Sequence, residues 1–230
     1  MTRLVHKVQL SFNKASVSYD GVAKLQRRAA AFLVDQIGQI SSLDPKTVLD
    51  LGTGTGCVPE LLFPRYPNSI YYLNDIADQM LEVCKVKFAP YPNIHYLPGH
   101  MMEVNVPRVD LVISNLALQW VEDWSSALQF FHAQSAQVFA FSTLLEGTFQ
   151  EWEEMLGRGR PFKFHQYPCA EALSTFCKHL KREDQSFQQW QWEVPLVFDS
   201  PRAFMLYLRD LGASPASCAI PLNPLLHLLR

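Results

Sequence analysis

The stretch VLDLGTGTGC, residues 48–57, determines how the rest of the chain is interpreted. It begins as a short apolar run, the pattern of a buried strand, and then places glycine at alternate positions, Gly52, Gly54 and Gly56. Because glycine has no Cβ, the backbone can turn tightly here and approach a ligand, and Gly56 lets the next helix pack closely. The stretch therefore predicts a ligand-binding turn between a strand and a helix.

Asp50 indicates which ligand this turn accepts. A carboxylate two residues ahead of the first glycine would repel a pyrophosphate but attract an ammonium. The dinucleotide fingerprint G-x-G-x-x-G also requires glycine at position 57, where this chain has Cys57. S-adenosylmethionine carries an ammonium and no phosphate, so the turn predicts this cofactor and disfavours a dinucleotide-dependent oxidoreductase. An aspartate that only caps a turn beside structural glycines is the alternative.

Asp75 gives a second signal, at the end of the next apolar run, SIYYLND. A carboxylate at the tip of the second strand can accept two hydrogen bonds from a ribose diol. Asp75 or Asp78 could instead cap the helix that follows. Taken together with Asp50 and the glycines, Asp75 makes the prediction of a nucleoside-containing cofactor specific.

Strand and helix patterns alternate along the chain after the glycine turn. The β-rich runs lie at 47–51, 69–75, 94–97, 110–115 and 136–142, with helical patterns between them. This alternation predicts an α/β fold with a doubly wound, Rossmann-like, mostly parallel sheet. A late strand is expected over 188–198, where QQWQWEVPLVF alternates with period two, and a last helix follows it.

A single domain is expected over residues 1–230, since a chain of 230 residues with 48% hydrophobic content can bury one substantial core. Its expected parts are a helical N-terminal cap, a cofactor-binding core, a small insertion or cap, and a terminal strand and helix, over 1–43, 44–156, 157–187 and 188–230.

Composition excludes several classes of protein. The formal net charge of −2 creates no overall field that would gather nucleic acid or an anionic membrane. The amino terminus resembles no signal peptide, and no apolar run reaches the roughly 18 to 20 residues that span a bilayer, so a soluble, cytoplasmic protein is expected. The five cysteines lack C-x-x-C spacing, which argues against a disulfide framework or a metal site.

Three stretches, VLDLGTGTG, LNDIADQML and SNLALQW, resemble the class I S-adenosylmethionine-dependent methyltransferases. More narrowly, SNLALQWVEDW (114–124) and FNKASVSYDGVAKLQRRAA (12–30) resemble the malonyl-acyl-carrier-protein O-methyltransferases of biotin synthesis. This resemblance runs from about residue 8 to about residue 213. It implies a sheet of the seven-stranded methyltransferase type. Whether the last strand is present stays undecided, because relatives usually continue through one more strand where this sequence stops.

The resemblance also implies a set of site residues. The residues expected to contact the cofactor are Asp50, Gly52, Thr53, Gly54, Gly56, Asp75, Ile76, His100, Met101 and Asn115. Methyltransferases with this turn often have an acidic residue for the adenine amino group where His100 stands, so the adenine contacts stay open. The expected catalytic residues, placed near the transferred methyl group, are Tyr19, Asn115, Gln119 and Trp120, and Phe12 is expected to extend their apolar wall.

The expected activity is carboxyl O-methylation of a malonyl group on acyl-carrier protein, early in biotin synthesis. The carboxylate nucleophile is already ionised at neutral pH, so no general base is required. Basic segments at 27–28, 158–163 and 178–182 are candidates for contact with the acidic carrier, and neither nucleic acid nor a membrane is expected as partner. A small acid of the trans-aconitate type and a noncatalytic S-adenosylmethionine-binding protein remain as alternatives.

Overall fold

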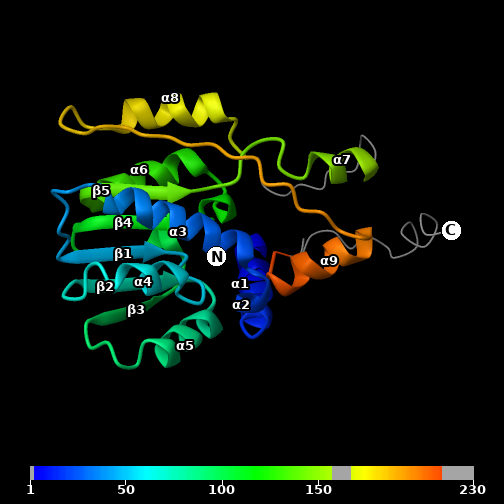
Figure 1. Ribbon diagram of the computed structural model, residues 1–230, viewed down its shortest axis with the longest axis horizontal. Coiled ribbons are helices and arrows are strands. Elements are labelled where there is room, and N and C mark those ends of the chain that lie inside the picture. Colours follow the sequence, from blue (N-terminus) through cyan, green and yellow to red (C-terminus); the bar gives the residue numbers. More distant parts are fainter. Residues whose placement is uncertain (1–2, 157–166, 214–230) are drawn as a thin grey trace.

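A computed structural model describes residues 3–156 and 167–213, which fold around one parallel sheet (Figure 1). The strands lie in the order β3-β2-β1-β4-β5. Their bounds are Thr47–Leu51 for β1, Ile70–Asp75 for β2, Ile94–Pro98 for β3, Val109–Asn115 for β4 and Ser135–Ser142 for β5. The predicted α/β class and parallel, doubly wound sheet are confirmed, with five strands in the described part of the chain.

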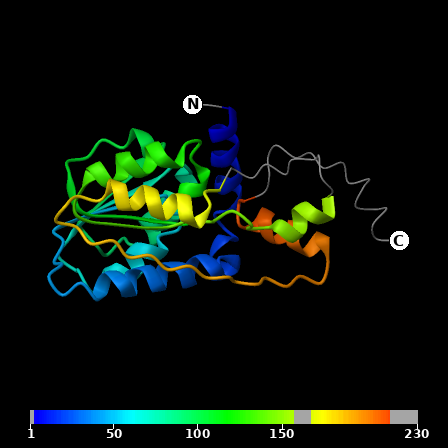
Figure 2. The ribbon, with the colours of Figure 1, turned by 90° about the horizontal axis from the view of Figure 1, so that it is seen from above.

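Helices cover both faces of this sheet (Figure 2). On β1, Val48 packs on the face covered by α3, α4 and α5, whereas Leu49 packs on the face covered by α6 and α8. Because side chains alternate along a strand, Asp50 falls on the same face as Val48. The helices span Lys24–Gly38 (α3), Cys57–Leu62 (α4), Asp78–Lys87 (α5), Trp124–Gln134 (α6) and Ala170–Leu180 (α8).

The N-terminal cap consists of α1 (Arg3–Ala15) and α2 (Tyr19–Val22), which lie beyond the carboxyl ends of the strands (Figure 1). Gln9 Nε2 donates to the carbonyl of Ile76 at 2.9 Å, just after β2. Ser18 Oγ donates to the carbonyl of Asp210 at 3.0 Å, at the end of α9 (Pro201–Asp210). The helical cap predicted from the first residues therefore joins the sheet to the last described helix.

Four charged side chains, named here the cap network, tie α2 to the helices around the glycine turn. Asp20 lies 3.5 Å from Arg27 and 3.4 Å from Lys87. Glu60 lies 3.6 Å from the same Arg27 and 3.5 Å from the same Lys87. Thr55 Oγ1, in the turn itself, donates to Asp20 Oδ1 at 2.5 Å. The network therefore links the N-terminal cap directly to the predicted ligand-binding turn.

A small aromatic core joins two helices outside the sheet. Trp152 of α7 (Gln150–Leu156) packs with Phe204 of α9, their ring centroids 5.0 Å apart. Within the described residues, no helix combines the length and apolar character that crossing a membrane requires. The remaining short helices are η1 (Met101–Glu103) and η2 (Leu118–Trp120).

Residues 188–198 differ from the prediction, since they are extended but form no strand. They run beside α3 (Figure 2), and the rings of Trp190 and Trp192 meet Phe32 of that helix edge-on, at centroid distances of 5.5 and 4.2 Å. Their alternating pattern thus arises from a helix on one side and solvent on the other, Val197 being 91% exposed.

In the described chain β5 pairs with β4 alone and forms an edge of the sheet. Two guanidinium groups donate to carbonyls at the start of this edge: Arg108 to Ser135 at 3.0 Å and Arg182 to Ala136 at 3.0 Å. Of the predicted insertion at 157–187, residues 157–166 lie outside the described residues and α8 occupies most of the rest. The domain boundaries remain a prediction.

Candidate functional site

The glycine turn follows β1 at the carboxyl end of the sheet. Gly52, Gly54 and Gly56 have φ angles of 70°, 57° and 84°, a left-handed backbone that glycine adopts without penalty. A Cβ on Gly52 would lie 2.4 Å from the Cβ of Ala117, and one on Gly56 would lie 2.3 Å from Cε2 of Phe88. Conformation and space therefore both demand glycine at these two positions, and Gly56 admits the close packing predicted for it.

Asp75 shapes the turn and also lines a cleft beside it. One carboxylate oxygen accepts from the backbone N–H of Gly54 at 2.8 Å, and the other accepts from that of Ala77 at 2.8 Å. Ala77 is the residue that caps α5, so Asp75 supports the start of this helix through it. Burial raises the pKa of Asp75 to about 6, against the lowering effect of these backbone donors.

Asp50 lies behind the turn and is buried, 1% exposed. Neither of its carboxylate oxygens has a hydrogen-bond partner within the described residues. Burial raises its pKa to about 7, the neighbouring Thr53 offsets part of this rise, and the charge of Asp75 adds to it. An unpaired buried carboxylate is costly, so this position favours a ligand that brings a positive charge.

The cleft beside the turn has a volume of about 1960 Å³. It extends from the N-terminal cap past the ends of β1, β2 and β4, and then along β5 toward residues 188–198. The predicted site residues that line it are Tyr19, Gly52, Gly54, Asp75, Ile76, His100, Met101, Asn115, Gln119 and Trp120. Three others do not line the cleft: Asp50 is a buried residue of β1, and Thr53 and Gly56 belong to the turn itself.

His100 follows β3 and begins η1. Its Nδ1 accepts from the backbone N–H of Met102 at 3.2 Å, so the neutral ring carries its proton on Nε2. At this position the chain therefore presents a hydrogen-bond donor, where an acidic residue would present acceptors. Met101 lies over the glycine turn, with Cε 3.4 Å from the place that a Gly52 Cβ would occupy.

An aromatic wall closes the cleft on the side of the N-terminal cap. The ring of Phe12 meets that of Trp120 edge-on at 5.2 Å and that of Tyr19 at 6.5 Å. Tyr19 also lies near the turn, with Cε1 3.9 Å from the place of a Gly54 Cβ. Burial raises the pKa of Tyr19, which keeps the phenol protonated. The structure therefore brings together the three aromatic residues that the sequence analysis placed near the methyl group.

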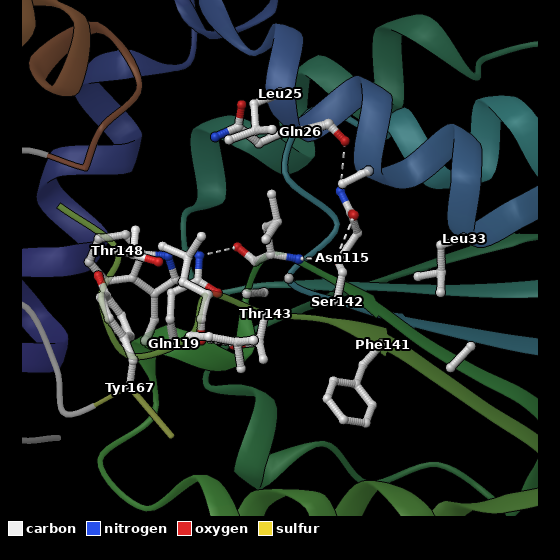
Figure 3. A pocket seen from close by; sticks show the side chains of 18 of the residues that line it. Leu25, Gln26, Leu33, Asn115, Gln119, Phe141, Ser142, Thr143, Thr148 and Tyr167 are labelled. Atoms are coloured by element: carbon white, nitrogen blue, oxygen red, sulfur yellow. Dashed lines mark hydrogen bonds between the residues drawn. The ribbon is translucent and has the colours of Figure 1, made fainter. Parts of the chain in front are cut away.

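Asn115 spans two elements with its side chain (Figure 3). Its Nδ2 donates to the carbonyl of Gln26 on α3 at 3.1 Å, and its Oδ1 accepts from Ser142 Oγ at 2.8 Å. Both ends of the amide are thus engaged within the protein. Gln26 and Ser142 could not be predicted from the sequence, because only the folded chain brings them next to Asn115.

Gln119 lies in η2, just past β4 (Figure 3). Its Nε2 donates to the carbonyl of Leu116 at 2.7 Å. Its Oε1 is buried and has no hydrogen-bond partner within residues 3–156 and 167–213. Gln119 therefore lines the cleft with its amide held against Leu116.

Comparisons with known proteins agree on one family. A profile described as "Methyltransferase domain" matches residues 49–133. A malonyl-acyl-carrier-protein O-methyltransferase from Neorickettsia risticii (strain Illinois) is 32% identical over 219 residues, covering 91% of this chain and 83% of that protein. One from Anoxybacillus flavithermus (strain DSM 21510 / WK1) is 29% identical, covering 90% and 80%.

Solved structures share the fold. The plantazolicin methyltransferase BpumL, in complex with S-adenosylhomocysteine, superposes with a TM-score of 0.58 at 14% identity, covering 79% of this chain and 77% of that one.

Proposed function

Because this chain belongs to the malonyl-acyl-carrier-protein O-methyltransferase family of S-adenosylmethionine-dependent enzymes, we propose that it methylates the free carboxylate of a malonyl group carried by acyl-carrier protein. This reaction belongs to the early pathway of biotin synthesis, in the cytoplasm. The observation that carries the proposal is the 32% identity to a relative of that name over 83% of its length, which includes the glycine turn and the SNLALQW segment.

The residues at the turn fit the cofactor. The unpaired carboxylate of Asp50 matches the methionyl ammonium, and Asp75, at the tip of β2, can accept hydrogen bonds from a ribose diol. Gly52 and Gly54, which have left-handed φ angles and no Cβ, line the cleft where we propose that the homocysteine part of the molecule lies. These assignments to individual residues are part of the proposal.

Methyl transfer to an ionised carboxylate depends more on how the two reactants are positioned than on acid or base catalysis. Bound S-adenosylmethionine supplies an electrophilic methyl group on a sulfonium. Transfer of this methyl group to the ionised carboxylate would form an oxygen–carbon bond and break the carbon–sulfur bond, giving a neutral ester and a thioether. In-line placement can contribute roughly 7 to 11 kcal/mol to such a step. The aromatic wall of Phe12, Tyr19 and Trp120 excludes water, and an aromatic face beside a cation adds about 0.5 to 2 kcal/mol.

The size of the cleft supports a carrier-linked substrate over a small free acid. Small-molecule sites are typically about 300 to 1000 Å³, whereas this cleft measures about 1960 Å³ and continues well beyond the glycine turn along β5. A small dicarboxylate and the cofactor would leave much of this space open. A long arm that joins the malonyl group to its carrier would use it.

A methyl-transfer assay on three acids tests the proposal. The purified protein is given labelled S-adenosylmethionine with malonyl-acyl-carrier protein, free malonate or trans-aconitate, and methyl ester is detected by mass spectrometry. The malonyl carrier is expected to be methylated with a much higher kcat/KM than either free acid. Equal rates on a free acid would favour the small-acid alternative, and cofactor binding with no ester formed would favour a noncatalytic protein.

A further inference from the structure

Leu116 has an unusual backbone conformation for its residue type. It follows β4 directly and lines the cleft. Its φ angle of 48° lies in the left-handed region, which residues other than glycine, asparagine and aspartate rarely adopt. Such a conformation persists only where the surrounding structure holds it, and it is frequent at functional sites. The contacts that hold Leu116 therefore indicate which residues shape the site.

Ser142, the last residue of β5, holds Leu116. The backbone N–H of Leu116 donates to Ser142 Oγ at 3.0 Å and to its carbonyl at 3.1 Å. The same hydroxyl donates its proton to Asn115 Oδ1 at 2.8 Å. One hydroxyl thus fixes two consecutive residues after β4, one through its backbone and one through its side chain.

The conformation of Leu116 in turn directs Gln119. The carbonyl of Leu116 accepts from Gln119 Nε2 at 2.7 Å, which fixes the amide and leaves its Oε1 buried and without a partner in the described chain. The η2 turn that carries Gln119 and Trp120 begins two residues after Leu116. A shift at Leu116 would therefore move both side chains in the cleft.

We propose that Ser142 is a positioning residue for methyl transfer. It holds the left-handed turn at Leu116 and thereby positions Gln119 and Trp120, which both line the cleft. The inference rests on the proposed function for what is transferred there. Ser142 itself is not expected to touch the reacting atoms, since its hydroxyl is used by Leu116 and Asn115.

Ser142→Ala and Ser135→Ala form a matched pair of variants. Ser135 lies at the other end of the same strand, is fully buried, and donates to the carbonyl of His132 at 2.9 Å. Both variants lose a serine hydroxyl from β5, but Ser135 does not line the cleft. Ser142→Ala is expected to lower kcat on malonyl-acyl-carrier protein by about 10- to 100-fold, the cost of misplacement near an ångström. Ser135→Ala should leave kcat close to that of the wild type.

Two further readouts separate positioning from loss of stability. The dissociation constant for S-adenosylhomocysteine, measured by calorimetry, should change far less than kcat in Ser142→Ala. Ser142→Thr, which keeps the hydroxyl, should recover most of the rate. The inference is overturned if Ser142→Ala retains full kcat, or if kcat falls equally in both alanine variants.

Hydrogen exchange tests the same idea without the reaction. In the cofactor-free protein, Ser142→Ala should speed amide exchange in the peptide that contains Leu116 to Trp120, and Ser135→Ala should not. Unchanged exchange there would overturn the role of Ser142. If the wild-type protein formed no ester on any acid, the proposed function would fail, and the exchange result would still decide whether Ser142 holds the turn.

Discussion

Asp50 is buried, and in the described chain neither of its carboxylate oxygens has a hydrogen-bond partner. Burial is the main cause of its raised pKa, and the charge of Asp75 contributes further. Because Asp75 also has a raised pKa, the cofactor-free site holds protons more tightly than the unfolded chain does. A ligand ammonium beside these carboxylates would reverse this preference, since it stabilises their ionised forms.

We therefore expect the cofactor-free protein to lose stability as the pH rises. In the unfolded chain both aspartates titrate near 3.9, whereas folded Asp75 and Asp50 titrate at about 6 and about 7. Their contribution to the free energy of unfolding is complete below about pH 4 and is lost as the pH rises through about 7. S-adenosylhomocysteine should raise Tm more at about pH 8 than at about pH 5, and Asp50→Asn should flatten the cofactor-free profile in thermal unfolding scans.

Asp75→Ala should weaken the binding of S-adenosylhomocysteine at least tenfold. The ribose would lose hydrogen bonds to a charged group, each worth about 1.5 to 3 kcal/mol. The carboxylate also accepts from Gly54 and Ala77, so circular dichroism must first show that the variant is folded. Calorimetry measures the affinity, and an unchanged value in a folded variant would remove Asp75 from the cofactor site.

Substitution of Trp120 should reduce turnover more than cofactor affinity. Its ring packs edge-on against Phe12 and lines the cleft. In the proposed site this ring lies on the substrate side of the methyl group. Trp120→Phe should keep part of the aromatic wall and part of the rate, and Trp120→Ala should keep little of either. Steady-state kinetics and calorimetry separate the two effects. Global unfolding of Trp120→Ala would show instead that the ring serves core packing.

At the scale of elements, the cap network determines how firmly α1 and α2 cover the cleft. Asp20 is its central acceptor, since it takes Thr55 of the turn, Arg27 of α3 and Lys87 of α5. Its side chain is 39% exposed, and ion pairs at such sites contribute only about 0 to 1 kcal/mol each. The cap is therefore fastened to the rest of the chain by several contacts that are each weak.

Asp20→Asn should loosen the cap without unfolding the core. Hydrogen exchange is expected to quicken over residues 15–23, and S-adenosylhomocysteine should dissociate faster in stopped-flow measurements. Asp35→Asn is the matched control, since Asp35 lies 3.6 Å from Arg65 in an exposed ion pair away from the cap. Equal changes in both variants would mean that the network has no special part in closing the cleft.

At the scale of the whole molecule, the described members of the predicted basic segments differ in how freely they can meet an acidic carrier. Arg27 is engaged in the cap network, and Arg182 donates to the carbonyls of Ser135 and Ala136. Arg28 and Lys178 are exposed. The basic residues of 158–163 lie outside the described residues and remain candidates from the sequence alone. Any attraction to the carrier must therefore be local, given the net charge of −2.

Added salt should then raise the KM for the carrier-linked substrate more than the KM for the cofactor. Surface attraction is screened beyond about 8 Å at physiological ionic strength, so KM for malonyl-acyl-carrier protein should rise with salt. KM for S-adenosylmethionine should change much less. Reversal of Arg158, Arg160 and Lys163 to Glu should reproduce the high-salt KM at low salt, and Lys46→Glu, which lies before β1, should not. Indifference of both KM values to salt and to charge would contradict docking by charge.

The sequence contains enough local information to predict the glycine turn and the parallel strands. Gly52 and Asp75 could be placed because a strand-turn-helix pattern is set by neighbours along the chain. The structure of residues 188–198 could not be predicted in the same way. A period of two shows that one side of the segment is covered, but not whether a strand or a helix covers it. Ser142 could not be found either, since its importance depends on a contact with Leu116 that only the pairing of β4 with β5 creates.

Within residues 3–156 and 167–213, β5 is unpaired along one side, which has a consequence for self-association. An unpaired edge strand is a template on which another polypeptide can add by main-chain hydrogen bonds. Arg108 and Arg182 donate to the carbonyls of Ser135 and Ala136 and place charge at the start of the strand, which discourages such addition there. The later part carries Phe139 and Phe141 stacked at 5.2 Å. Aggregation of concentrated or partly unfolded protein should therefore begin at the carboxyl half of this strand.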